Sequence, residues 1–360
     1  MTSWGNVYDI IIEPSPTARR WVSRSIYETD LGAAFCGDSL KVLRSKRLQR
    51  HKGEVQLVFT SPPFPLITRK KYGNVRGEEY IEWFAQFAPL LGDLVADTGS
   101  IVIEMGNAWE SGRPVMSTLV LRALLRFLEE GGLNLCQEFV WYNPARLPSP
   151  AQWVNVERIR VKDAFTRIWW MSRSDRPKAD NRRVLRAYSQ SMKRLIQTGK
   201  YNAGRRPSEH TIGENSFKVN NNGAIPPNVL NGDEAPSLSS LLKGTNTHSY
   251  DQYQLFSRAK NIPLHPARMP PELVEFFLRF LTEERDLVLD PFAGSNTTGA
   301  VAEKLGRRWI SCEANWEYAS SSIARFPPSL ITRTCKDLTL EKTDHAASSA
   351  SSVFTPLFTS

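Results

Sequence analysis

The stretch VLDPFAGSNTTGAVAEKLGRRWISCE, residues 288–313, decides the fold. Its first apolar run ends at Asp290, a short loop with glycine and serine leads into a helical stretch, and a second apolar run ends at Glu313. Glu313 follows Asp290 by 23 residues. In a Rossmann-like sheet, a carboxylate at this spacing accepts hydrogen bonds from ribose hydroxyl groups. The stretch therefore predicts a strand–loop–helix–strand unit that holds a ribose.

The loop after Asp290 argues against a pyrophosphate ligand. Dinucleotide sites use three glycines for close backbone approach, whereas Phe292, Asn296 and Thr297 occupy this loop. An adenosine cofactor without phosphates fits better, with its carboxylate near backbone N–H groups at a helix N-terminus. S-adenosylmethionine is such a cofactor. The competing interpretation is an ordinary crossover in which the glycine only makes a turn.

The surrounding chain alternates apolar, strand-like runs with stretches of helical spacing, which is typical of an α/β sheet of parallel type. We expect strands at 33–36, 55–59, 100–106, 136–142, 285–290 and 307–313. We expect one helix that begins at 39, and further helices at 78–97, 119–132, 270–286 and 297–306.

This alternation fails in the middle of the chain, which is rich in Pro, Asn, Ser and Arg. We interpret that part as an inserted module with irregular structure. The C-terminal residues are rich in Ser, Ala and Thr, a composition typical of disorder. The predicted division is an irregular N-terminal extension at 1–30, a catalytic half at 31–143, a target-recognition region at 144–262, a cofactor-binding half at 263–336 and a disordered tail at 337–360.

The positive charge of the chain is confined to one segment. The formal net charge is +9 and the pI about 9.4. Residues 141–210 contain 16 Lys and Arg against 5 Asp and Glu, so this segment carries +11 and the rest of the chain −2. A solvated basic face is the plain interpretation, but the confinement of the surplus favours a nucleic acid as partner.

Two classes of protein are disfavoured by the sequence. No apolar run approaches the roughly 18 residues of a membrane span, and the start of the chain has neither the basic region nor the small-residue cleavage site of a secretory signal. The cysteines lie far apart, without a CxxC pair, which argues against a metal site or a disulfide framework and favours a reducing cytoplasm. These cysteines are Cys36, Cys136, Cys312 and Cys335.

The stretch VQLVFTSPPF, residues 55–64, ends an apolar run with two prolines and an aromatic residue. The plain interpretation is a turn, because consecutive prolines end strands and remove two backbone donors. The alternative is a site that needs a hydroxyl group, carbonyl acceptors and an aromatic face together.

TSPPF after one strand and DPFAGSNTTG after another resemble the amino-group DNA methyltransferases. The order, with TSPPF first, the basic region next and DPFAG last, is similar to their β-class, a permuted form of the S-adenosylmethionine fold. GDSL, WYNPARLPSP, the IWW stretch and HPARMP extend the similarity to the PvuII-type cytosine-N4 enzymes. The resemblance covers residues 33–325. It implies a mixed, Rossmann-like α/β sheet and site-specific methyl transfer from S-adenosylmethionine to duplex DNA, in a type II restriction-modification system.

The chemistry of an exocyclic amino group explains the residues of TSPPF. The nitrogen lone pair is delocalised into the ring, and hydrogen-bond acceptors on the two N–H groups can free it. Pro62 offers a carbonyl group without a competing N–H, and Ser61 offers a hydroxyl group. Phe64 can stack on a base taken out of the duplex. The resemblance implies Ser61, Pro62, Pro63, Phe64 and Glu104 as catalytic residues, although a strand-end charge is an equal interpretation of Glu104.

The position of methyl transfer on the base is less fixed than the reaction. Cytosine-C5 transfer would need a thiolate, usually in a Pro-Cys pair, and no cysteine here follows a proline. Adenine-N6 enzymes mostly carry Asp where this chain has Ser61, which favours cytosine N4 and leaves adenine N6 as the alternative. A DNA-binding regulator with a vestigial pocket is the rival from another class, and the basic segment disfavours a small-molecule substrate.

The resemblance also implies a cofactor-binding set. HPARMP contributes a lid over the methionine end, and GDSL an acidic residue for the adenine, for which a helix-start carboxylate is the competing interpretation. The implied set is Asp38, Thr60, His265, Pro266, Arg268, Asp290, Phe292, Ala293, Gly294, Ser295, Asn296, Thr297 and Glu313.

The DNA contacts are expected around the start of the middle region. Trp141 is a candidate second stacking face, with a core tryptophan as the alternative. Candidates for reading bases or binding phosphates are Asn143, Arg146, Ser149 and Arg160. The expected partner is double-stranded DNA in a prokaryotic cytoplasm, near the nucleoid. A genetically linked restriction endonuclease that forms no stable complex is a further expectation, and the resemblance suggests a short palindromic target.

Overall fold

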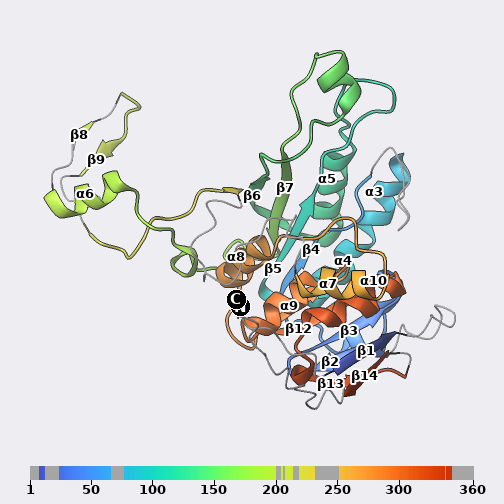
Figure 1. Cartoon of the computed structure of the whole chain (residues 1–360). Coiled ribbons are helices and arrows are strands. Elements are labelled where there is room, and N and C mark those ends of the chain that lie inside the picture. The colour runs from blue at the N-terminus through green and yellow to red at the C-terminus, as the bar shows by residue number, and fades with distance from the viewer. Residues whose placement is uncertain are drawn as a thin grey trace, which may run out of the picture.

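A mixed sheet forms the centre of the molecule, with helices on both faces (Figure 1). This computed structural model describes residues 8–12, 24–65, 77–199, 204–205, 207–213, 219–231, 251–336 and 338–342. Within those ranges, ten strands form the central sheet in the order β10-β6-β7-β5-β4-β11-β12-β3-β2-β13. Its strands are β2 (Ser25–Thr29), β3 (Gly32–Cys36), β4 (Val55–Thr60), β5 (Val95–Met105), β6 (Asn134–Tyr142), β7 (Phe165–Ser172), β10 (Val229–Asn231), β11 (Leu287–Asp290), β12 (Arg308–Glu313) and β13 (Ile331–Thr334).

The strand directions put the ends of five neighbouring strands at one edge. β3, β12, β11, β4 and β5 are parallel to one another, so their carboxyl ends meet at the same side. β7 runs antiparallel between β5 and β6, which makes β6 parallel to β5. The open edge of such a sheet, beyond the carboxyl ends of its strands, is where α/β proteins bind ligands.

The helices cover the two faces of the sheet separately. One face carries α1 (Ser39–Leu43), α2 (Lys46–Gln49), α3 (Gly77–Ala85), α4 (Phe87–Leu94) and α5 (Leu119–Gly131). The other carries α8 (Pro271–Leu281), α9 (Thr297–Lys304) and α10 (Trp316–Ser321), with α7 (Gln252–Ala259) packed on α10 and on the short helix η3 (Ser322–Arg325). η4 (Pro328–Leu330) leads into β13.

Alternating side chains of the central strands build the two cores. In β11, Leu287 and Leu289 pack with the α3–α5 side, and Val288 packs with the α8–α9 side. Both sets are almost fully buried, because the strand is covered on both faces. Such strands are near-continuous apolar runs, and this is why the sequence predicts them well.

The N- and C-terminal parts are more regular than the sequence predicts. β1 (Tyr8–Ile12) pairs antiparallel with β14 (Leu338–Lys342), and β2 belongs to the central sheet. The predicted irregular extension is therefore wrong at 8–12 and at 25–29, and the predicted disordered tail is wrong at 338–342. β1 and β14 stabilise each other from opposite ends of the chain, and β2 pairs with the neighbouring β3 on one side and with the distant β13 on the other. Local composition does not reveal the distant partners. The rest of the predicted tail, from 343, lies outside the described residues.

The middle region is also divided differently from the prediction. β7, placed by the sequence in an inserted module, is a buried strand of the central sheet, and α7 packs against the cofactor half of the chain. The basic composition around β7 obscured its strand pattern. What leaves the sheet is the loop 143–164, which contains the π-helical turn η1 (Gln152–Val156), and an arm between η2 (Asn181–Val184) and β10.

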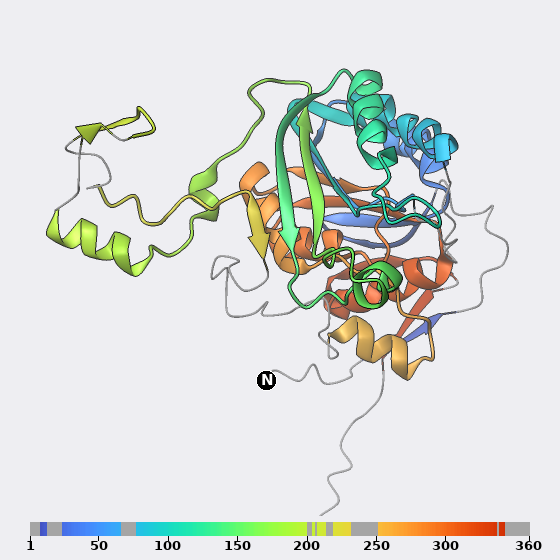
Figure 2. The same cartoon turned by 90° about the horizontal axis from the view of Figure 1, so that it is seen from above.

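The arm extends away from the body of the protein in both views (Figures 1 and 2). It contains α6 (Gln190–Thr198) and the short hairpin of β8 (Gly204–Arg205) and β9 (Thr211–Ile212). No residue of α6 is buried. The arm therefore gains little stability from the core and presents most of its surface to solvent.

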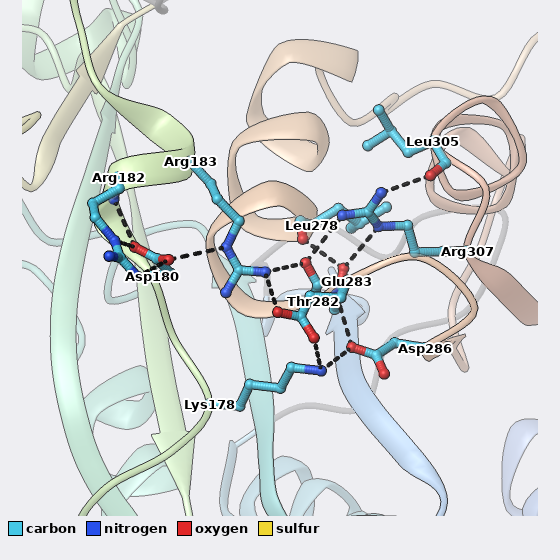
Figure 3. A network of polar contacts seen from close by, with 10 residues as sticks. All are labelled: Lys178, Asp180, Arg182, Arg183, Leu278, Thr282, Glu283, Asp286, Leu305 and Arg307. Carbon is cyan, nitrogen blue, oxygen red and sulfur yellow. Dashed lines mark hydrogen bonds and ion pairs between the residues drawn. The ribbon is translucent and has the colours of Figure 1, made fainter. Parts of the chain in front are cut away.

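A polar network fixes the base of the arm to the end of α8 (Figure 3). The ammonium group of Lys178 lies 2.7 Å from a carboxylate oxygen of Asp286 and 2.9 Å from one of Glu283. Arg183 donates to the carbonyl oxygen of Thr282 at 2.8 Å. These contacts join the chain after β7 to the turn before β11, so the base of the arm is tied to the central sheet next to α8.

Candidate active site

A cavity of about 480 Å³ lies at the carboxyl edge of the sheet, where the strand ends meet. The ends of β4 and β5 supply Ser61 and Glu104, and the ends of β11 and β12 supply Asp290 and Glu313. Sequence segments that lie far apart, TSPPF and DPFAG, thus face one cavity. Most of the predicted site residues line it: Asp38, Ser61, Pro62, Pro63, Phe64, Glu104, Trp141, Asn143, Arg146, His265, Pro266, Arg268, Asp290, Phe292, Ala293, Gly294, Ser295, Thr297 and Glu313.

The end of β4 places a hydroxyl group against a carboxylate. The Ser61 hydroxyl donates to a carboxylate oxygen of Glu104 at 2.5 Å. Glu104 is partly buried, and the withdrawal of its carboxyl group from water raises its pKa, while the bond from Ser61 and the charge of Arg146 lower it part-way. The pair can therefore pass or hold a proton at the cavity wall.

The ring of Phe64 fits against a glycine. A Cβ atom added at Gly106 would lie 2.6 Å from the nearest ring carbon, so only a residue without a side chain leaves room. Gly106 directly follows β5. The sequence offered no reason to select this glycine, because its partner is 42 residues away.

Asp290 stabilises the loop that follows it. Its carboxylate accepts from the hydroxyl groups of Thr60 and Thr298, each at 2.6 Å, and from the backbone N–H of Phe292 at 3.1 Å. Burial raises its pKa to about 6, with these bonds opposing the rise. Thr60 therefore reaches the site through Asp290, and it is not among the residues that line the cavity.

Asn296 also lies behind the cavity wall. It is in the left-handed region with φ of 53°, its side chain caps α9 by accepting from Gly299 N–H at 3.0 Å, and its amide donates to the Tyr27 hydroxyl at 2.9 Å. Asn296, expected in the cofactor pocket, is not among the residues that line the cavity, and 1% of it is exposed. Its contacts instead hold the start of α9.

Glu313 is the last residue of β12, and its carboxylate accepts hydrogen bonds from two backbone N–H groups. Gly294 N–H and Asn315 N–H donate to its two oxygens at 2.9 and 2.8 Å. Burial nevertheless raises its pKa to about 7. The first of these bonds also fixes the loop after Asp290 against the end of β12.

Asp38 is both a helix cap and a cavity residue. Its carboxylate accepts from Lys41 N–H at 3.0 Å and starts α1, so the helix-start interpretation is correct, and the residue still lines the cavity. The neighbouring Ser39 hydroxyl donates to the carbonyl oxygen of Pro291 at 2.5 Å. This bond joins GDSL to the DPFAG loop.

HPARMP lies over the DPFAG loop. A Cβ atom on Gly294, which has φ of 53°, would lie 3.0 Å from the His265 ring, so the two are in close contact. The His265 ring packs edge-on against Tyr318, and its backbone N–H donates to the Tyr253 hydroxyl at 3.1 Å. Burial lowers the pKa of His265 to about 4, so the ring is uncharged at neutral pH.

The DNA-contact candidates separate into two groups. Asn143 and Arg146 line the cavity, as does the stacking candidate Trp141. Ser149 and Arg160 do not. The Arg160 guanidinium lies 4.0 Å from the centre of the Trp109 ring and also donates to the carbonyl oxygen of Pro114, so it fastens two loops together.

The sequence analysis missed an aromatic group and an arginine. Trp83 and Phe87 line the cavity from α3 and α4, and Phe87 packs on Phe292 with ring centres 4.9 Å apart. Arg325 donates to the Ser295 carbonyl at 2.5 Å and lies over the Tyr253 ring at 4.8 Å. Helical spacing marks Phe87 as buried, but only the tertiary fold reveals that Phe87 and the half-buried Trp83 face a cavity.

In the ranges that the structure describes, no cluster of three or more His, Cys, Asp or Glu side chains could hold a metal ion. Nor does any described helix have the length and apolar character to cross a membrane.

Comparison with known proteins identifies the family. The model of the DNA methylase family for N6 and N4 methyltransferases matches residues 55–324. The chain is 43% identical over 302 residues to the type II methyltransferase M.PvuII of Proteus hauseri, covering 83% of this chain and 85% of that protein. This chain belongs to the DNA methylase family. The family predicted from TSPPF and DPFAG is thereby confirmed.

Similarity in structure agrees with the sequence match. The methylase fold matches the PvuII DNA methyltransferase (cytosine-N4-specific) with a TM-score of 0.65 and 36% identity, covering 86% of this chain and 90% of that one. The predicted fold class is thus confirmed. A shorter match, 44% over 61 residues, connects the methylase to the DNA adenine methyltransferase YhdJ of Escherichia coli K12, covering 17% of this chain and 21% of that protein.

Proposed function

We propose that this methylase transfers a methyl group from S-adenosylmethionine to the exocyclic N4 of cytosine in a short duplex target. The observation that carries the proposal is the single cavity in which Ser61, Glu104 and Phe64 meet the DPFAG loop and Glu313. One half of this cavity offers a hydroxyl–carboxylate pair and an aromatic face, and the other half offers a ribose-type carboxylate. Such a site unites a nucleobase with an adenosine cofactor.

The donor set of the second half fits S-adenosylmethionine. Glu313 is a buried carboxylate at the end of a strand, and Asp38 lines the same cavity. The half-buried Phe292, supported from behind by Phe87, offers an aromatic face for a purine. The DPFAG loop holds no third glycine for a pyrophosphate. Bound here, S-adenosylmethionine would supply an electrophilic methyl group from its sulfonium.

The other half suits an amino group. The Glu104 carboxylate holds the Ser61 hydroxyl, which leaves the serine oxygen free to accept from an amino N–H of the target base. The raised pKa of Glu104 fits a group that takes up a proton when the amino nitrogen loses one. Phe64, seated on Gly106, would stack on the extruded base.

Double-stranded DNA is the substrate that the basic middle region supports. Arg146 lies at the cavity, and the arm carries further exposed cations. We also propose that the methylase protects prokaryotic chromosomal DNA in the cytoplasm against a genetically linked restriction endonuclease, without a stable complex between the two. The similarity to M.PvuII supports this placement.

Nucleoside mass spectrometry tests the proposed reaction. DNA incubated with the protein and S-adenosylmethionine should contain N4-methylcytosine, and digestion of the product with a set of restriction enzymes should show which site is protected. N6-methyladenine without N4-methylcytosine would replace cytosine by adenine as the target. Tight DNA binding that Ser61→Ala leaves unchanged, with no methyl transfer by the native chain, would indicate a regulator instead.

A further inference from the structure

The loop 143–164 exposes large apolar side chains beside the cavity. Val161 is 88% exposed and Leu147 80%, the highest values among the large hydrophobic residues that the structure describes. Val156 and Ile159 in the same loop are 68% and 58% exposed. Single exposed hydrophobics are ordinary, but a group of them on one projecting loop marks an interaction surface. In Figure 1 this loop, with η1, rises above the sheet.

The loop is held in one conformation by its own contacts. The Asn107 amide donates to the Asp163 carboxylate at 2.9 Å, and Trp153 packs edge-on against Trp109 at 6.3 Å. At its base, the Lys162 ammonium donates to the carbonyl oxygen of Pro144 at 2.6 Å. This bond brings together the two segments that carry Leu147 and Val161. The contacts within the loop 143–164 therefore hold these apolar side chains in exposed positions before any partner binds.

The surroundings of the two side chains favour DNA as the occupant. Leu147 follows Arg146, which lines the cavity, and Val161 stands between Arg160 and Lys162. Asn143 N–H donates to the Ala164 carbonyl at 2.8 Å, so the base of the loop is continuous with the cavity wall. Two apolar side chains with cationic neighbours suit duplex DNA, because its phosphates are negatively charged and its stacked bases form an apolar interior.

We propose that Leu147 and Val161 form an apolar wedge that enters the base stack where the target base has left it. The inference rests on the proposed function, since a base that reaches Ser61 must first leave the duplex. Extrusion leaves a gap and unstacked neighbours, and apolar side chains fill such openings in other DNA-binding proteins. Burial of the two side chains against bases then offsets part of the cost of extrusion.

The test compares duplexes that differ only in how easily the target base leaves. Leu147→Ala, Val161→Ala and the double variant are assayed on an oligonucleotide with the protected site, once with the target base paired and once opposite an abasic position. The wedge predicts that kcat/KM of the double variant falls at least about tenfold on the paired duplex, which corresponds to about 1.4 kcal/mol. On the abasic duplex the loss should almost disappear, because no pairing opposes extrusion.

Fluorescence of 2-aminopurine beside the target base gives a second readout. The native chain should raise the signal on binding, and the double variant should raise it less at saturating protein. Leu125→Ala, which removes a side chain 59% exposed on α5, is the matched control and should behave as the native chain.

Two outcomes would overturn the wedge. One is unchanged kcat/KM on the paired duplex, which would assign the apolar group to another partner, such as a protein. The other is an equal loss on both duplexes, which would assign it to reading of neighbouring bases. Methylation by the native chain is measured in the same series, so failure of the proposed function would appear there, before any variant is compared.

Discussion

The contact between Ser61 and Glu104 concentrates the proposed chemistry in two side chains. Because the serine hydroxyl donates to the carboxylate at 2.5 Å, each residue positions the other, and removal of either should affect the same step. We expect Ser61→Ala and Glu104→Gln each to lower kcat about 10²-fold or more, the usual contribution of proton transfer. The dissociation constant for S-adenosylmethionine should change little.

Single-turnover methylation and cofactor titration measure these two quantities separately. The double variant should lose hardly more than either single variant, because residues that act as a unit are not additive. Full turnover by Glu104→Gln would remove the carboxylate from the mechanism and leave it as a strand-end charge.

The pKa of Glu313 predicts how cofactor binding depends on pH. Burial raises this pKa to about 7, so the carboxyl group is largely protonated at pH 6 and largely ionised at pH 8. A ribose needs an ionised acceptor, and the affinity for S-adenosylmethionine should therefore rise with pH through about 7 and level off above it. Calorimetry between pH 6 and 8 measures this rise, and Glu313→Gln should abolish it.

The free energy of unfolding should depend on pH in the opposite sense to the affinity for S-adenosylmethionine. Since the folded chain holds the Glu313 proton more tightly than the unfolded chain, the free energy of unfolding without cofactor should fall as pH rises from about 4.5 to 7.

For the affinity prediction, the contradicting outcome is an affinity for S-adenosylmethionine that does not change with pH in the native chain. It would mean that Glu313 does not bind the ribose.

Gly106 gives a further test at the scale of single atoms. In Gly106→Ala the new Cβ would lie 2.6 Å from the Phe64 ring, so the ring must shift. We expect kcat/KM for DNA to fall on the order of tenfold, because stacking on one base contributes about 1–3 kcal/mol. In a Phe64→Ala background the same substitution should have little further effect, and a steady-state comparison of the four proteins checks this.

At the scale of elements, Arg325 joins the short helix η3 to the DPFAG loop and to α7. It donates to the carbonyl and hydroxyl oxygens of Ser295 at 2.5 and 2.9 Å, pairs with Asp251 at 3.5 Å and lies over Tyr253. Lysine cannot reproduce this planar set of bonds. Arg325→Lys should lower the free energy of unfolding by about 1–3 kcal/mol and weaken cofactor binding.

Chemical denaturation and cofactor titration test this expectation. Arg333→Lys, on the exposed side of β13, is the matched control and should change neither quantity. An Arg325→Lys variant with unchanged cofactor affinity would show that the loop keeps its shape without the clamp.

At the centre of the sheet, the sequence predicts well the strands β4, β11 and β12, which are covered on both faces. β4, β11 and β12 are mostly apolar runs that end at TSPPF, DPFAG and Glu313, so the run and its terminus together define each strand. β2 and β7 do not stand out in this way. β2 is short, and its Tyr27 is buried against Trp309 and Phe326, with its hydroxyl group bonded to that of Ser322, 295 residues away. Such long-range pairing cannot be recognised in local periodicity.

The residues of the candidate site also differ in whether local sequence or a distant partner defines them. Ser61, Asp290 and Glu313 could be predicted because motif and strand end coincide in the sequence. Arg325 and Gly106 could not, since each acquires its role from a partner on another element. Asn296 shows the converse, because a residue inside a motif can face away from the cavity and stabilise the loop from behind.

At the scale of the whole molecule, the charge and the projecting parts coincide. Residues 141–210 hold the basic surplus, and they include the loop beside the cavity and the arm with α6 (Figure 2). The network at Lys178 and Arg183 ties the base of this arm to the turn between α8 and β11. The proposed cofactor pocket and the proposed DNA-contact surface therefore belong to one framework.

The arm should contribute affinity for DNA without a role in methyl transfer. Lys193 and Arg194 are exposed on α6 and suit contacts with phosphates. α6 lies well away from β4 and β5, the strands that end at the cavity (Figure 1). Replacement of both by Ala should raise KM for DNA and reduce the slope of log affinity against log salt by about one per lost phosphate contact. The kcat at saturating DNA should remain that of the native chain.

Fluorescence anisotropy at several salt concentrations measures the slope, and methylation of a long and a short duplex measures the reach of the arm. Lys46→Ala with Arg50→Ala, both exposed outside the basic segment, is the matched control and should leave the slope unchanged. If the two pairs of variants lose equal affinity, net charge alone attracts DNA and the arm has no defined position on it. If only the α6 pair loses affinity, and only on the long duplex, the arm binds phosphates beyond the target site, since the short duplex does not extend to it.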